Sequence, residues 1–204
     1  MPLNLDYLQE LSDLFVSDVR KSAYYANLSE TERREFDVQV EQEEMRGLRP
    51  LLPGAEEEAL ERLSEAMPKE LGIPLPHSVA EILRQVDGFV ENGVSLYGVD
   101  AEFRDGQFDS GPGLLAENLA TWSGHVETAQ KYLFVGDSDL WLFAIDLSDG
   151  RSLALDRSRL IPQHWFSTLE EMVDDMMRQA LGYLDEETDQ SASGPPPEDL
   201  FSRN

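Results

Sequence analysis

Apolar side chains in the first part of the chain recur at helical spacing. The first stripe, at intervals of three and four residues, consists of Leu8, Leu11, Phe15, Val19 and Ser22. This spacing places all five on one face of an α-helix. Asn4 or Asp6 is suited to cap its start. The pattern therefore predicts an amphipathic helix.

Two more helices are expected before residue 70. Ser29 and Glu32 form a capping-box pattern, in which each side chain satisfies the other residue's free amide. The apolar face that follows is thin and consists of Phe36, Val40 and Met45. After a break at Pro50, Pro53 and Gly54, acids at 56–58 suit the first turn of the next helix. Its inward face consists of Ala59, Leu60, Leu63 and Met67.

A boundary rich in proline and glycine separates these helices from the middle of the chain. It contains Pro68, Gly72, Pro74 and Pro76. Beyond it, helical spacing predicts a further helix with an inward face of Val79, Ile82, Leu83 and Val86. Ser78 and Glu81 suggest its cap, and Gly88 is placed for the left-handed residue that ends many helices.

The pattern then changes from helical to extended. It predicts strands at 94–99, 132–135, 140–145 and 152–155, a short helix or turn at 114–121, and a hairpin turn at 148–150. Both faces of 140–145 are apolar, which is typical of a central strand covered on both sides.

A last helix is expected from Ser167, with Glu170 completing a second capping-box pattern. Its apolar face consists of Leu169, Met172, Val173, Met176, Ala180 and Leu184. Residues 185–204 are acidic and rich in Ser and Pro, a composition typical of a disordered tail. Helices at both ends of a block of hairpin-linked strands predict an α+β fold.

Charge narrows the functions that the chain can have. Its 204 residues include 41 Asp and Glu against 16 Lys and Arg, a formal net charge of −25. Nucleic-acid binding and docking on anionic membranes both need clustered Lys and Arg, so this balance argues against both. The absence of Cys excludes disulfides and thiolate metal sites and fits a reducing compartment. With no leader pattern and no apolar run long enough for a bilayer, we expect a cytoplasmic protein of one domain with appendages.

No catalytic pattern stands out in the sequence. The three histidines, His77, His125 and His164, have no partner at the spacing of a helical zinc site. Nucleophile-elbow, Walker and dinucleotide motifs are absent. We therefore expect no enzyme activity and no cofactor.

Clustered aspartates offer a weak suggestion of a metal site. Asp137 with Asp139, and Asp146 with Asp149, resemble parts of a calcium loop, but they lack its third-position ligand and its closing Glu. Strand ends and hairpin turns rich in Asp are the simpler interpretation, so we expect no bound metal.

The middle of the chain resembles a known family. The residues that carry the resemblance are Leu75-Pro76, Gln85-Val86-Asp87-Gly88-Phe89, Asn92-Gly93-Val94, Leu96-Tyr97-Gly98, Asn118, the stretch 132–139, and Phe166-Ser167 with Leu169-Glu170-Glu171-Met172. Their order and spacing, over roughly residues 75–184, resemble the SUKH superfamily, the Smi/Knr-like fold, and in particular its bacterial YrhA-like branch. Asp87 stands where many relatives have Asn, a mild change because both suit a turn.

The resemblance implies a SUKH-like α+β domain over 71–184, in which helices pack against a mixed or antiparallel sheet without catalytic machinery or a general cofactor. Residues 1–70 would then be a helical N-terminal extension packed on this core, and 185–204 an acidic disordered tail. Bacterial members are predominantly immunity proteins of polymorphic toxin systems, which bind and neutralise a toxin encoded beside them. Fungal relatives regulate cell-wall assembly.

We therefore expect a non-enzymatic immunity protein whose partner is a cognate toxin or another protein effector. An acidic protein complements a basic partner such as a nuclease, and complementary charge speeds association. The interface candidates are Glu91, Asn92, Tyr97, Asp137 and Asp139, which combine acids near strand ends with an aromatic side chain. Asn92 is also suited to shape its turn. We expect a monomer or weak dimer that binds neither nucleic acid nor membrane.

Three other functions stay open at this point. The chain could be a regulatory or scaffold protein of the Smi/Knr type, which holds partners through its helical N-terminus and its acidic tail. It could be a hydrolase or metal-dependent enzyme built on the Asp clusters. Its charge alone also permits a DNA mimic.

Overall fold

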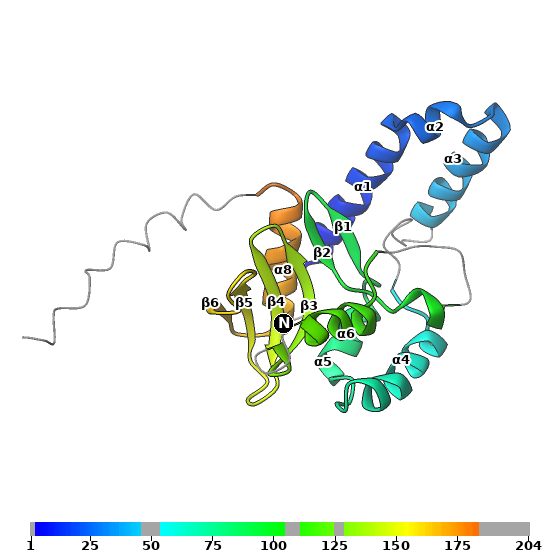
Figure 1. The fold of residues 1–204 in the computed structure, drawn as a ribbon. Coiled ribbons are helices and arrows are strands. Elements are labelled where there is room, and N and C mark those ends of the chain that lie inside the picture. Colours follow the sequence, from blue (N-terminus) through cyan, green and yellow to red (C-terminus); the bar gives the residue numbers. More distant parts are fainter. Residues whose placement is uncertain (1–2, 46–53, 105–110, 125–128, 184–204) are drawn as a thin grey trace, which may run out of the picture.

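The fold is built around one antiparallel sheet, seen in a computed structural model that describes residues 3–45, 54–104, 111–124 and 129–183. Its six strands are β1 (Phe89–Glu91), β2 (Val94–Leu96), β3 (Tyr132–Ser138), β4 (Trp141–Asp146), β5 (Ser152–Asp156) and β6 (Pro162–Phe166). The strands lie in the sheet in the order of the sequence, β1-β2-β3-β4-β5-β6 (Figure 1). Because each strand pairs with its neighbour in the chain, successive turns alternate between the two ends of the sheet.

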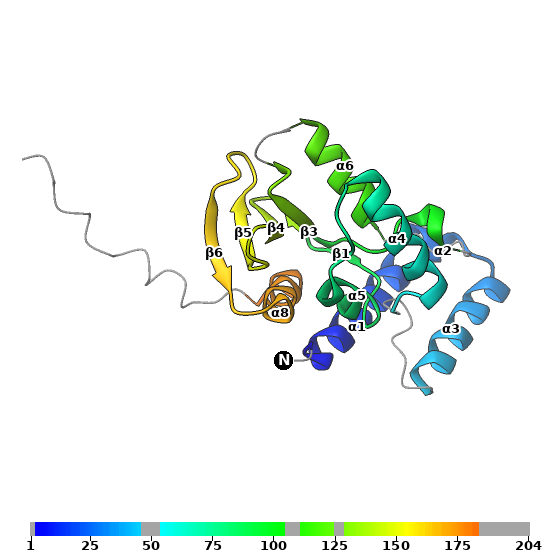
Figure 2. The ribbon, with the colours of Figure 1, turned by 90° about the horizontal axis from the view of Figure 1, so that it is seen from below.

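Helices cover the sheet and extend beyond it. They are α1 (Leu5–Lys21), α2 (Ala23–Asn27), α3 (Glu30–Met45), α4 (Glu57–Glu70), α5 (His77–Leu83), a 3-10 turn η1 (Ala101–Phe103), α6 (Leu114–Gly124) and α8 (Leu169–Ala180). Figure 2 shows α8 against one side of the sheet and α6 toward the other. The expected α+β class is confirmed.

The expected central strand is confirmed, although it lies one residue later in the chain than the predicted range 140–145. β4 lies between β3 and β5, and its four inner residues are buried. The expected hairpin is also present, since β5 pairs with β4 from Ser152 to Asp156. Two strands were missed: β1 has three residues, and β6 exposes its three middle side chains. Neither therefore has the long apolar or alternating pattern that marks a strand in a sequence.

The expected helix faces are mostly confirmed. The inward residues of α4, Ala59, Leu60, Leu63 and Met67, are all buried, as are Val79, Ile82, Leu83 and Val86 in and after α5. The Ser29–Glu32 capping box forms, with Ser29 N donating to Glu32 Oε2 at 2.8 Å and Glu32 N donating to Ser29 Oγ at 3.3 Å. Asn4 caps α1 by accepting from the amide of Asp6.

In the expected stripe of α1, Leu8 and Leu11 are buried and Val19 and Ser22 are half-buried, but the prediction for Phe15 is wrong. Phe15 is 37% exposed, and Val16 is buried in its place. The second half of α1 faces α3, because Arg20 forms an ion pair with Asp37 at 2.9 Å. Val16 lies one turn before Arg20 on the same side of the helix, so Val16 turns toward α3 and Phe15 turns outward.

Two predicted caps are also wrong. The N-cap of α8 is Thr168, whose hydroxyl accepts from the amide of Glu171, so the capping pair lies one residue later than predicted. The N-cap of α5 is Pro76, which makes no side-chain cap bond. Gly88 does have a left-handed φ of 76°, but it follows the end of α5 by five residues and leads into β1.

The tail expected at 185–204, together with Leu184, lies outside the described residues. In the part of the chain that the structure describes, no helix has both the length and the apolar composition needed to cross a membrane.

Candidate protein-binding surface

Three turns meet at one end of the sheet and form what we call the turn rim, residues 92–93, 139–140 and 157–161 (Figure 1). A Cβ built on Gly93 would lie 3.7 Å from Asp139 Oδ2, so the first two turns are adjacent. The amide of Arg157 donates to the carbonyl of Leu140 at 3.1 Å, which joins the second turn to the third. The rim therefore presents residues from three hairpins as one surface.

The first turn is shaped by Asn92 and Gly93, whose φ angles are 47° and 77°. Two successive left-handed residues match the tight hairpin turn that Asn-Gly favours. Asn92 Nδ2 donates to the carbonyl of Ala180 at 2.6 Å, at the C-terminal end of α8. Asn92 thus fastens the turn to the helix.

Asp137 lies just inside the second turn, on the face of the sheet away from α8. A Cβ on Gly136 would collide with the Met176 side chain of α8, so Gly136 faces that helix and Asp137 faces the other way. Asp137 Oδ2 pairs with Arg157 Nη1 at 2.6 Å, and the same nitrogen donates to the carbonyl of Ser138 at 2.8 Å. Asp139, in the turn itself, is exposed.

Tyr97 lies behind this face and is only 4% exposed. Burial raises the pKa of its phenol, and the charges of Asp137 and Glu117 raise it further while Arg157 lowers it. Burial likewise raises the pKa of Glu117, which α6 contributes to the same neighbourhood. Because so little of the Tyr97 ring reaches solvent, we leave Tyr97 out of the candidate surface.

Glu91 is turned toward the opposite face of the sheet. Glu91 lies opposite Val94 in β2, and Val94 lies opposite Ser138 in β3, so the three side chains share one face of the sheet. Ser138 is two residues after Gly136, which faces α8, and this shared face is therefore the α8 side. Burial raises the pKa of Glu91, and the charge of Asp18 in α1 raises it further. The structure therefore brings Asp137 and Asp139 together, and it places Glu91 and Asn92 toward the helices.

The turn rim also contains an exposed apolar side chain, Leu140, that was not predicted from the sequence. Leu140 was expected to start the central strand, but that strand begins at Trp141 and Leu140 is 67% exposed in the turn. The signal was present in the sequence: a tight hairpin between 138 and 141 leaves 139–140 as the loop. Exposed Leu140 beside Asp139 gives the surface an apolar centre next to a negative charge.

The other aspartates that suggested a metal site hold turns. Asp146 Oδ1 accepts from the amide and the hydroxyl of Ser148, at 2.8 Å and 2.6 Å. Asp149 accepts from the amide of Arg151 at 3.0 Å and pairs with its guanidinium at 2.7 Å. Across the described ranges, no group of three or more metal-ligating side chains comes together.

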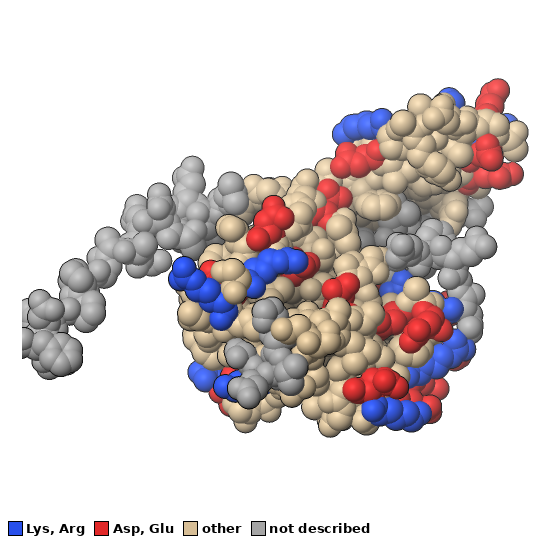
Figure 3. Space-filling model, viewed as in Figure 1, with Lys and Arg blue, Asp and Glu red and all other residues tan. Residues whose placement is uncertain are grey.

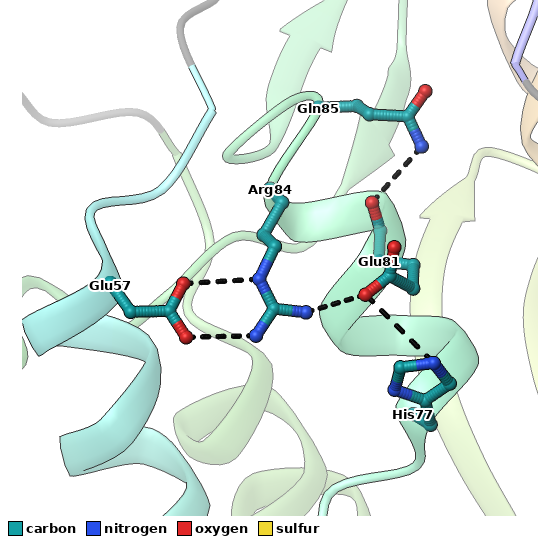
Figure 4. Close-up of polar contacts among 5 residues, drawn as sticks. All are labelled: Glu57, His77, Glu81, Arg84 and Gln85. Carbon is teal, nitrogen blue, oxygen red and sulfur yellow. Dashed lines mark hydrogen bonds and ion pairs between the residues drawn. The ribbon is translucent and has the colours of Figure 1, made fainter.

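His77 belongs to an exposed charged network that joins α4 to α5 (Figure 4). Arg84 donates to both carboxylate oxygens of Glu57, at 3.0 Å and 2.8 Å, and pairs with Glu81 at 2.6 Å. His77 Nε2 lies 3.9 Å from Glu81 Oε1. Hydrogen bonding from Arg84 lowers the pKa of Glu57, as expected for a group that ties two helices together.

Of the two other histidines, only His164 lies in the part of the chain that the structure describes. His164 lies on β6 with its ring edge-on to Phe166 at 4.6 Å between centroids. His125 lies outside the described residues.

Acidic and basic side chains are mixed over the face of the molecule that Figure 3 shows. Both signs of charge occur on the helical arm of α1–α3 and around α4, and basic side chains also lie near the β5–β6 turn.

Comparisons with known proteins identify no relative of this chain. No protein-family model matches the chain, and a search of curated proteins also finds no match.

Proposed function

We propose that this protein is a non-enzymatic immunity protein of the SUKH type, which binds and neutralises a basic toxin. The observation that carries the proposal is the net charge of −25. Complementary charge raises association rates toward about 10⁸–10⁹ M⁻¹s⁻¹ at low salt, and an inhibitor must reach its toxin before the toxin reaches its target. The resemblance of residues 75–184 to the SUKH superfamily supports the same proposal.

The proposed contact surface is the second turn of the rim. Leu140 supplies an exposed apolar side chain, and Asp139 supplies an exposed carboxylate next to it, while the carboxylate of Asp137 is paired with Arg157. Interfaces draw most of their binding energy from a few apolar or aromatic anchors surrounded by polar residues. A toxin with an apolar spot ringed by Lys or Arg would fit this arrangement.

Co-expression with the product of the adjacent gene tests the proposal. We expect the chain to restore growth to cells that produce the neighbouring toxin domain, and the two proteins to elute as one complex. Protection that requires equimolar chain indicates neutralisation by binding, whereas protection by a small fraction of that amount indicates an enzyme. The proposal fails if no adjacent reading frame encodes a toxin-like domain, or if growth is not restored.

The helical arm favours a second candidate, a regulatory or scaffold protein. Helices α1–α3 reach beyond the sheet in Figure 1, and Tyr24 in α2 is exposed. Exposed aromatic side chains are frequent anchors of protein contacts. In that case affinity capture returns housekeeping proteins instead of one effector, and Tyr24→Asp abolishes the capture while Leu140→Asp does not.

A further inference from the structure

β6 leaves one edge of the sheet open. Within the described residues it pairs only with β5 (Figures 1 and 2). The outer N–H and C=O groups of an edge strand readily pair with another strand, so natural sheets usually cover or charge such edges. β6 begins with Pro162, but Gln163, His164 and Trp165 after it are all exposed.

The side chains along this edge combine apolar surface with positive charge. Ile161 is 48% exposed and Trp165 is 41% exposed. The Arg151 guanidinium lies 4.0 Å from the centre of the Trp165 ring, and Arg159 is exposed in the β5–β6 turn. A segment that covers this edge should therefore be extended, acidic and partly apolar.

We propose that the outer edge of β6 is covered by residues 198–202 of the same chain, which add to the sheet as a further strand. These residues, which lie outside the described part, read Glu-Asp-Leu-Phe-Ser. Two acids suit the arginines beside β6, and Leu200 and Phe201 suit exposed Ile161 and Trp165. Three prolines precede the segment and favour an extended approach.

The intervening chain is long enough for this contact. Asn92 bonds to Ala180, which places the end of α8 at the β1–β2 turn. From β2 to β6 there are four strand spacings, or about 19 Å. The fourteen residues 184–197 span up to about 45 Å when extended. Because β6 begins at the turn rim, the segment reaches it from the same end of the sheet.

Hydrogen exchange of the full chain tests the proposal. In the double variant Leu200→Asp with Phe201→Asp, we expect the β6 amides that point away from β5 to exchange at least about tenfold faster than in the unchanged chain. Amides of β5 are paired on both sides by described strands and serve as the internal reference. A peptide of residues 195–204 added to the double variant should restore the protection, and the same peptide with both aspartates should not.

Ala192→Asp is the matched control, because it adds one charge to the same region outside the proposed strand. It should leave the exchange of β6 unchanged. Equal β6 exchange in the unchanged chain and the double variant would overturn the proposal. Protection that disappears on dilution would also overturn it, because the edge would then be covered by a second copy of the chain.

Discussion

The side-chain amide of Asn118 in α6 forms the two backbone hydrogen bonds of Phe134 in β3 that a neighbouring strand would otherwise form. Its Nδ2 donates to the Phe134 carbonyl at 2.7 Å, and its Oδ1 accepts from the Phe134 amide at 2.9 Å. β2 pairs with β3 only at Gly136–Ser138, with one further bond from Tyr97 to Val135. Asn118 therefore continues the hydrogen bonding of β3 where β2 has ended.

Removing this amide should destabilise the fold strongly. Asn118→Ala leaves the buried N–H and C=O of Phe134 without these partners, and each such group costs about 1–3 kcal/mol. We expect a loss of about 2–5 kcal/mol in the free energy of unfolding, measured by chemical denaturation. Leu119→Ala, at a partly exposed position next to it, should cost far less. Similar losses for the two variants would contradict this role of Asn118.

Asn92 combines a backbone role with a side-chain role, and two substitutions separate them. Asn92→Gly still adopts the left-handed backbone conformation without strain and loses only the hydrogen bond to Ala180. It should therefore lower the free energy of unfolding by about 0.5–1.5 kcal/mol. Asn92→Ala adds the penalty of a left-handed conformation, about 1–2 kcal/mol. Chemical denaturation should therefore give a lower free energy of unfolding for Asn92→Ala than for Asn92→Gly. The reverse order would show that the turn does not keep its positive φ.

Asp174 predicts a measurable dependence of stability on pH. Burial raises the pKa of its carboxyl, as does the charge of Glu170, while a hydrogen bond from the amide of Asn4 lowers it. A raised pKa in the folded state means that the folded protein holds this proton more tightly than the unfolded chain does. The stabilisation of the folded protein by protonated Asp174 is therefore complete below the ordinary Asp pKa of about 3.9. It is lost as the pH rises through the folded-state pKa.

Asp174→Asn should remove this dependence while its side-chain oxygen still accepts from Asn4. We expect the variant to gain stability relative to the unchanged protein as pH rises, to a plateau below about 1 kcal/mol because solvent screens this half-buried group. Thermal unfolding over a pH series measures it. Glu170→Gln should reduce the pH dependence in part. A variant that loses stability relative to the unchanged protein as pH rises would contradict the sign.

Leu140 is expected to matter for binding and not for folding. Leu140→Asp places a charge at an exposed turn position, so the free energy of unfolding should change by no more than about 0.5 kcal/mol. Affinity for the proposed toxin, measured by calorimetry, should fall by at least about tenfold, a typical loss for an interface anchor. Tyr24→Asp is the control at an exposed position on the arm. An unchanged affinity for Leu140→Asp would exclude the turn rim as the contact surface.

The candidate surface was only partly predictable from the sequence. Asp137 and Asp139 were named because acids follow an apolar run, and this local pattern places both at the end of β3. The pairing of Asp137 with Arg157 joins residues twenty positions apart, and no short-range pattern contains it. Glu91 was grouped with them as an acid near a strand end and Tyr97 as an aromatic side chain, but strand alternation and the position of α8 decide which face each one occupies.

Interactions that are local in the chain were determined by the sequence itself. The Ser29–Glu32 capping box, the inward face of α4 and the β4–β5 hairpin depend on residues a few positions apart, and the structure has them as the pattern predicts. Only the tertiary structure decided the rest: the strand role of β6, the outward turn of Phe15 and the use of Asn118 as a substitute strand. Each of these depends on which distant element lies alongside, because burial and backbone pairing are set by neighbours in space.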